Sequence, residues 1–184
     1  MMIEREDLEN GIEHVLHEMR LLVGALSLAR QRRMRLSLPP DALSPDLLSL
    51  AVRATPIELP ALHASHLLTF FSASPPSPEF LHATHYMDGF QVGDDLRPRL
   101  DALRERVEAQ VAPLTRRRVS NDGQSTGPHS YSFRPGEFLP LLECCRRFAL
   151  ELSESSWLES APPIAIDDWR ETRLGLEALI RDIG

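Results

Sequence analysis

Histidine is the residue type whose placement in this sequence could support chemistry. Six of the seven histidines form three H-x-x-H pairs, namely His14/His17, His63/His66 and His82/His85. On a helix, residues three positions apart lie on one face, with Cβ atoms about 5–6 Å apart. Helical proteins present imidazole nitrogens to metal ions with such spacings. The pairs therefore raise the hypothesis of a helical, histidine-based metal-binding protein.

Helical phase predicts a different environment for each of the first two pairs. His14 and His17 lie about 140° and 160° from the centre of the apolar stripe of their helix, so both should face solvent. Glu13 and Glu18 flank this pair, which indicates a solvated polar face. His63 lies about 60° from the apolar centre of its own helix and should be half-buried and hydrogen-bonded, whereas His66 lies about 120° away.

The third pair lies in a segment without a clear helical pattern, so its spacing does not fix a common face. Helical di-metal sites also need inward carboxylates, often as Glu-x-x-His. Glu79 and His82 have that spacing, but they follow Pro78 in an expected loop. We therefore expect no metal centre and no cofactor. If a metal does bind, the candidate ligands are His63, His66, His82 and His85.

The charged residues restrict the possible partners. The net charge is −7, and all 20 basic residues are arginine, so Schiff-base chemistry at lysine is excluded. A negative net charge argues against general nucleic-acid binding. Arg116, Arg117 and Arg118 form a run that could hold phosphate or a partner. The alternative is that these arginines are solvated at a helix end.

The apolar spacing predicts an all-α, single-domain bundle of five or six helices over residues 1–184. We expect helices over 4–33, 45–54, 60–72, from 94 or 95 to 112, 135–153, and from 167 or 168 to 182. A Ser/Pro-rich connection spans about 72–93 with a short helical turn near 80–86, and a flexible loop spans about 120–134. Neither a signal peptide nor a membrane-spanning run is present in the sequence, which predicts a cytoplasmic protein with no membrane contact.

Two stretches carry a family resemblance. Residues 61–71 (ALHASHLLTFF) and 104–118 (RERVEAQVAPLTRRR) resemble segments of small bacterial all-α proteins. Those proteins carry the patterns hARxLxxFF and R-x-x-x-N-K-x-x-A-H-L-T-x-x-R, and they are similar to HEPN domains. The resemblance implies a helical bundle that is either a ribonuclease toxin or an inactive relative, often dimeric, in a toxin–antitoxin or defence context.

The sequence departs from the HEPN pattern at its catalytic motif, which is Arg, four to six residues, then His. Arg106 is present, but Pro113 stands at the histidine position, and Ala109-Gln110 replace the Asn-Lys pair. Proline offers neither a proton nor a ligand atom. The resemblance therefore implies a member that is not a nuclease by this mechanism.

These observations rank three functions. We expect first a non-catalytic bundle acting through a protein partner or a homodimer, with RNA as a further candidate partner. The second is an RNA- or nucleotide-acting enzyme around Arg106, Arg116 and His63, with Arg118 as a further catalytic candidate. The third is the histidine-based metal-binding protein.

Overall fold

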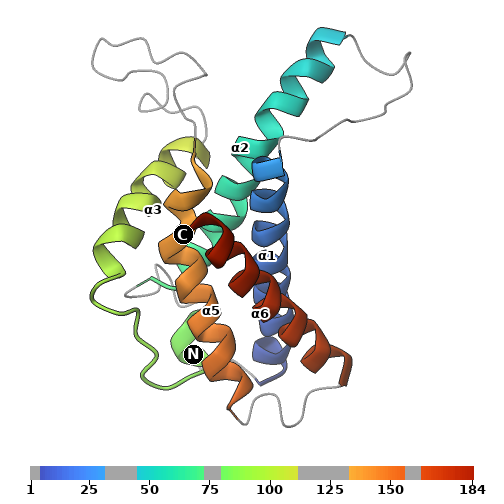
Figure 1. Cartoon of the computed structure of the whole chain (residues 1–184). Coiled ribbons are helices and arrows are strands. Elements are labelled where there is room, and N and C mark those ends of the chain that lie inside the picture. Colours follow the sequence, from blue (N-terminus) through green and yellow to red (C-terminus); the bar gives the residue numbers. More distant parts are fainter. Residues whose placement is uncertain (1–4, 32–44, 73–79, 112–132, 156–162) are drawn as a thin grey trace.

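The computed structural model describes residues 5–31, 45–72, 80–111, 133–155 and 163–184. Within these ranges the chain is all-α, as predicted, with five α-helices, two short 3₁₀ helices and no strand (Figure 1). The elements are α1 (Arg5–Gln31), α2 (Pro45–Phe70), η1 (Ala83–His85), α3 (Arg97–Val111), η2 (Pro135–Phe138), α5 (Leu139–Ser153) and α6 (Pro163–Ile183).

Two predicted helix boundaries are wrong. The sequence predicts separate helices over 45–54 and 60–72, but α2 is continuous across Pro56 and Pro60. A proline removes one backbone donor from the helical hydrogen-bond ladder, and the remaining bonds and the packing of a largely apolar helix preserve the turn. Helix α6 begins at Pro163, before the predicted start at Asp167 or Asp168. Proline suits the first helical position because its fixed φ is already helical.

Helices α1 and α2 carry the site described below, and α6 packs against α1. Glu18 of α1 contacts His63 and His66 of α2, and the two helices run antiparallel in Figure 1. Helix α6 packs on another side of α1, where Arg20 pairs with Asp168 at 3.1 Å and Arg30 pairs with Asp182. Because the partner numbers rise together, α1 and α6 run parallel.

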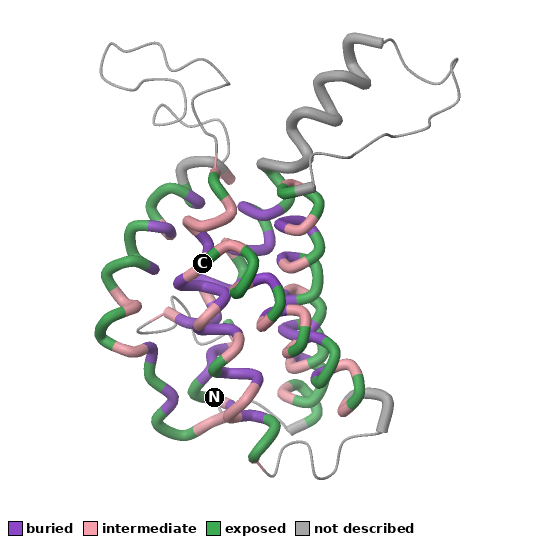
Figure 2. Tube along the Cα trace, viewed as in Figure 1, coloured by how far each residue is buried: buried purple, intermediate pink, exposed green. Residues whose placement is uncertain are grey.

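The core is organised around one aromatic ring. Phe148 of α5 is fully buried, and its ring lies 5.1–6.4 Å from five other ring centroids. These rings belong to Phe70, Phe71, Tyr86, Phe90 and Trp169. They come from α2, α6 and the connection before α3, so a single ring joins elements far apart in the sequence. Buried positions accordingly follow the inward sides of the helices (Figure 2).

The described part of the connection, residues 80–93, is packed against the bundle. It holds η1, and it buries Ala83, Tyr86 and Phe90. Gly11 of α1 permits the close approach: a Cβ there would lie 2.6 Å from the Tyr86 hydroxyl and closer still to a methyl group of Leu81. The short helical turn predicted near 80–86 is confirmed. No helix in the described ranges is long and apolar enough to cross a membrane.

Candidate metal site

A single carboxylate on α1 meets two imidazoles on α2. Oε2 of Glu18 lies 2.9 Å from Nδ1 of His63 and 3.0 Å from Nδ1 of His66. An ionised carboxylate only accepts hydrogen bonds, so Nδ1 of His63 donates to Glu18 when no metal is bound, whereas Nδ1 of His66 lies beside the same oxygen as an ion-pair contact. Among the described residues, this is the one group of three His, Cys, Asp or Glu side chains whose donor atoms lie within 4.8 Å of one another.

Helix α2 gives its two histidines different environments. His63 is 8% exposed, which is more buried than the half-buried state predicted from its phase. The side chain of His66 is 55% exposed, and that of Glu18 is 23% exposed. The cluster therefore has one buried ligand, one ligand that is largely covered, and one that reaches solvent.

The two separations between the Glu18 oxygen and the histidine nitrogens are close to those in a metal site, and all three donor atoms lie within 4.8 Å of one another. In a tetrahedral zinc site with bonds of about 2.0–2.1 Å, neighbouring donor atoms lie about 3.3 Å apart. The two measured separations from Glu18 are 2.9 and 3.0 Å, so a metal would need to push the oxygen and each nitrogen apart by a few tenths of an ångström. The exposed His66 side chain can make that adjustment without moving the core.

A pocket of about 360 Å³ opens beside this cluster. Its polar lining consists of His14, Glu18, His66 and Thr69. The rest of its lining is apolar and consists of Gly11, Val15, Leu67, Phe70, Phe80 and Leu81. Two members of the Glu18–His63–His66 cluster therefore border the pocket directly.

The His82/His85 pair serves the backbone instead. His82 is buried, and its Nε2 lies against the carbonyl oxygen of Ser72, so Nε2 carries the proton and donates. Its Nδ1 accepts from the Thr84 hydroxyl at 2.7 Å and from the backbone N–H of Thr84 at 3.3 Å. The backbone N–H of His82 donates to Nδ1 of His85 at 3.1 Å. Three of the four ring nitrogens thus hold the connection around η1 in place.

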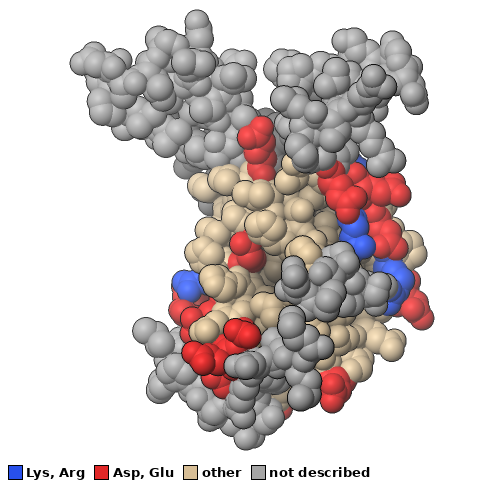
Figure 3. All heavy atoms as spheres, turned by 180° about the vertical axis from the view of Figure 1, so that it is seen from behind, with Lys and Arg blue, Asp and Glu red and all other residues tan. Residues whose placement is uncertain are grey.

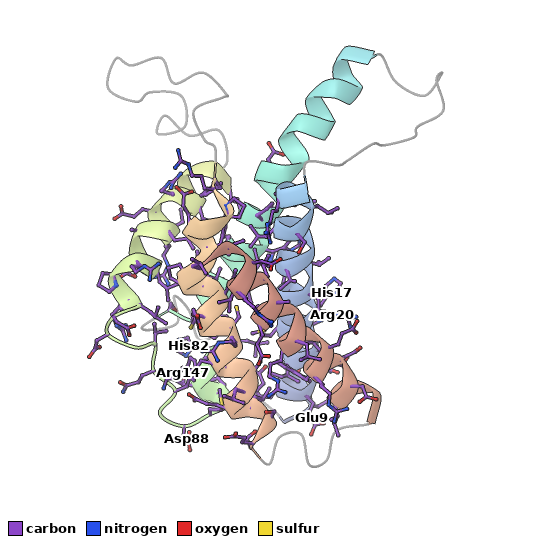
Figure 4. All side chains as sticks on the ribbon, viewed as in Figure 1. Glu9, His17, Arg20, His82, Asp88 and Arg147 are labelled. Atoms are coloured by element: carbon purple, nitrogen blue, oxygen red, sulfur yellow. The ribbon has the colours of Figure 1, made fainter. Side chains whose placement is uncertain are left out.

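The structure confirms the predicted exposure of the first pair. His14 and His17 are both exposed on α1, and Figure 4 shows His17 and Arg20 on the outer side of that helix. His14 lies one turn before Glu18, at the rim of the pocket. The carboxylate of the predicted Glu79–His82 spacing lies outside the described residues.

The position of Glu18 was not predicted. The sequence indicates a solvated Glu18 beside Glu13, and that prediction is wrong because Glu18 faces α2. One signal was available: Glu18 lies about 100° from the centre of the α1 stripe, closer than His14 or His17, at an edge where a neighbouring helix can pack. Phase alone does not name that neighbour.

Arg106, the catalytic candidate from the HEPN resemblance, already has partners. Its guanidinium pairs with Glu137 at 2.6 Å and lies 5.0 Å from the centroid of the Phe133 ring. Burial acts to raise the pKa of Glu137, but the hydrogen bonds and charges of Arg106 and Arg134 outweigh it and lower that pKa. Arg106 therefore faces η2, whereas His63 faces α1.

The arginine run cannot be placed, because Arg116, Arg117 and Arg118 lie outside the described residues. The enzyme hypothesis that combines Arg106, Arg116 and His63, with Arg118 as a further candidate, stays a prediction. On the face shown in Figure 3, acidic side chains predominate over basic ones among the described residues. That charge distribution gives no support to phosphate binding on this face.

The two cysteines do not compete as metal ligands. Both are buried on α5. Burial raises the pKa of Cys144 to about 12 and raises that of Cys145 as well. Because the thiolate is the form that binds metal, these thiols are poor ligands at neutral pH.

Comparison of the chain with protein family models, with curated proteins and with solved structures found no match. The HEPN resemblance is therefore neither supported nor contradicted, and it stays a prediction.

Proposed function

We propose that this protein binds a divalent transition-metal ion, with zinc as the first candidate, between α1 and α2. The observation that carries the proposal is the convergence of two Nδ1 atoms on one Glu18 oxygen, at 2.9 and 3.0 Å. Two imidazoles and one carboxylate form a ligand set that holds zinc in some enzymes and iron in others. The His63/His66 pair is thus the H-x-x-H pair whose geometry favours metal binding.

Metal binding here would couple to folding. The ligands come from two helices, and an unfolded chain does not hold them together, so the metal binds the folded state preferentially. Three protein ligands also leave one position of a tetrahedral ion open, as in zinc sites that bind an exogenous molecule. Glu18 and His66 border the pocket, so the open position would be reached from there.

Zinc titration of tag-free protein tests the proposal. By calorimetry and by metal analysis after gel filtration, we expect about one zinc per chain, since one three-ligand cluster is present. His66→Ala removes an exposed ligand without opening the core and should weaken binding at least about 100-fold, because one of three ligands is lost. His17→Ala is the matched control, because it removes a histidine that is also exposed, from α1.

The carboxylate offers a second matched pair. Glu18→Gln keeps the size of the side chain but removes the charge, and it should also weaken zinc binding. Glu13→Gln makes the same change on the exposed side of α1 and should leave binding unaltered. Uptake below about a tenth of a zinc per chain, or equal affinity in the Glu18 and Glu13 variants, would exclude a site of this ligand set.

The second candidate function is contact with another copy of the chain. Four large apolar side chains on the adjacent helices α1 and α2 are 37–46% exposed, and they are Leu21, Leu28, Leu59 and Leu62. Exposed apolar patches mark interaction sites in soluble proteins. The HEPN resemblance also implies a dimer, and its toxin–antitoxin context belongs to this candidate.

Sedimentation velocity across a concentration series tests this second candidate. We expect a dimer that dissociates in Leu28→Glu and Leu62→Glu, since each replaces one of these exposed leucines with a charge. Leu174→Glu on α6, where the leucine is 53% exposed, is the matched control and should leave the dimer intact. A wild-type chain that sediments as a monomer throughout would contradict the candidate.

A further inference from the structure

The pocket beside the cluster is lined by both polar and apolar side chains. Glu18 and His66 belong to both the cluster and the pocket lining. The apolar part of the lining includes Leu67, Phe70, Phe80 and Leu81. A ligand that fills this space must therefore combine an apolar body with one polar group, and that group must lie at the metal ligands.

The volume sets the size of such a ligand. A cavity of roughly 150 Å³ holds benzene, and this pocket has about 360 Å³. It is thus more than twice as large as a space that takes a six-carbon ring, so a chain of about six to ten carbons fits. Its volume also falls within the usual range for small-molecule sites.

Whether a metal is bound determines which charge the polar group of the ligand must carry. Without a metal, the Glu18 carboxylate would repel an anion and attract an amine. With a divalent ion bound, one carboxylate and two neutral imidazoles leave a net positive centre with an open position. A carboxylate can then act as the fourth ligand, and the exposed imidazole of His14 stands at the same rim to donate a hydrogen bond.

We propose, on the basis of the metal-binding function above, that the pocket binds a medium-chain aliphatic carboxylate. Its carboxylate completes the coordination of the metal held by Glu18, His63 and His66. Its chain lies along the apolar wall, against Phe80 and Leu81.

The test uses full-length protein loaded with zinc, with octanoate, butanoate and octylamine as the probes. Each pair of buried methylenes raises affinity about tenfold, and octanoate has four more methylenes than butanoate, so octanoate should bind about 100-fold more tightly if its whole chain is buried. Octanoate should not bind measurably to the metal-free protein. Tighter binding of octylamine than of octanoate, or octanoate binding that does not depend on zinc, would overturn the proposal.

A wall variant checks that the ligand occupies this pocket. Phe80 is 48% exposed, so Phe80→Ala removes part of the wall without opening the core, and it should weaken octanoate binding about fivefold to tenfold. The zinc affinity of this variant should be unchanged. Leu174→Ala removes an exposed apolar side chain from α6 and should alter neither affinity.

The two proposals can fail separately. Normal zinc binding with no binding of octanoate, or with unchanged octanoate affinity in Phe80→Ala, overturns the carboxylate ligand and leaves the metal site standing. Absence of zinc binding overturns both.

Discussion

The H-x-x-H pairs His63/His66 and His82/His85 have the same spacing but different partners in this bundle. On α2, His63 and His66 both direct Nδ1 toward one carboxylate of a neighbouring helix, at 2.9 and 3.0 Å. Around η1, the nitrogens of His82 and His85 face backbone groups of their own segment, the Thr84 hydroxyl and the Ser72 carbonyl. The difference lies in the partner: a carboxylate can exchange its hydrogen bonds for a shared metal ion, whereas backbone groups hold the imidazoles in a structural role.

The strongest test of this difference between the two pairs is the effect of zinc on the thermal stability of the protein. At free zinc of about 100 times the dissociation constant, a ligand specific for the folded state adds about 2.7 kcal/mol. For a chain of this length that is a rise in Tm of about 5–10 °C. Scanning calorimetry should show this rise in the wild type and in His85→Ala, but not in His66→Ala. A rise that depends on His85 would reverse the assignment of the two pairs.

The second prediction concerns the metal-free fold. His82→Ala removes a buried donor and acceptor, leaves the Ser72 carbonyl without its imidazole partner and should lower the free energy of unfolding by about 2–3 kcal/mol. His66→Ala breaks only an exposed ion pair and should cost less than about 1 kcal/mol. Urea unfolding in the presence of a chelator measures both. Equal losses in the two variants would contradict a structural role confined to His82.

The helices could be predicted because the apolar pattern that specifies each helix lies within that helix's own sequence. The stripe of α1 and the apolar face of α5 repeat every three to four residues, and both helices form where that period indicates. The boundaries of α2 and α6 could not be read in the same way. Proline at position 60 predicts a break, yet this residue is buried within α2, and tertiary packing outweighs the lost hydrogen bond.

The site could be predicted only in part, because its residues come from different elements. Phase identifies His63 as the histidine nearest to an apolar face, and the structure buries it. The same phase places Glu18 at the edge of its stripe, but which helix covers that edge depends on how α1 and α2 pair. The partner of His82, the Ser72 carbonyl, is a backbone group ten residues away, and side-chain patterns carry no signal for it.

A third prediction compares the Glu18 carboxylate with the Glu137 carboxylate. Glu137 pairs with Arg106 and accepts from the backbone N–H of Arg134, so it has a fixed cation where Glu18 has two imidazoles. Because this site is partly exposed, Glu137→Gln should lower the free energy of unfolding at neutral pH by about 0.5–1 kcal/mol. It should leave zinc affinity unchanged.

The pH dependence of that effect follows from the lowered pKa of Glu137. A depressed carboxyl pKa stabilises the fold above the ordinary value of 4.5 and loses this contribution as the pH falls through the lowered value. Urea unfolding should therefore show wild type and Glu137→Gln converging in acid. A difference that persists in acid would assign the effect to packing and not to charge.

The smallest effect is expected from acid titration of His85. Burial, and then the neighbouring His82, lower the pKa of His85 below 6.5. The unfolded chain then binds the proton more readily than the folded chain. Protonation of this residue therefore destabilises the fold as the pH falls from 6.5 through the lowered value, and it contributes nothing above that range.

The variant His85→Gln keeps an acceptor for the backbone N–H of His82 but does not titrate. Compared at about pH 7.5 and about pH 5.5 in a chelator, this variant should lose less stability on acidification than the wild type. His17→Gln, which replaces an exposed histidine, is the control and should behave as the wild type does. An equal loss in His85→Gln and wild type would mean that the His85 nitrogen is not held as an acceptor, and the contrast between the two histidine pairs would then rest on His82 alone.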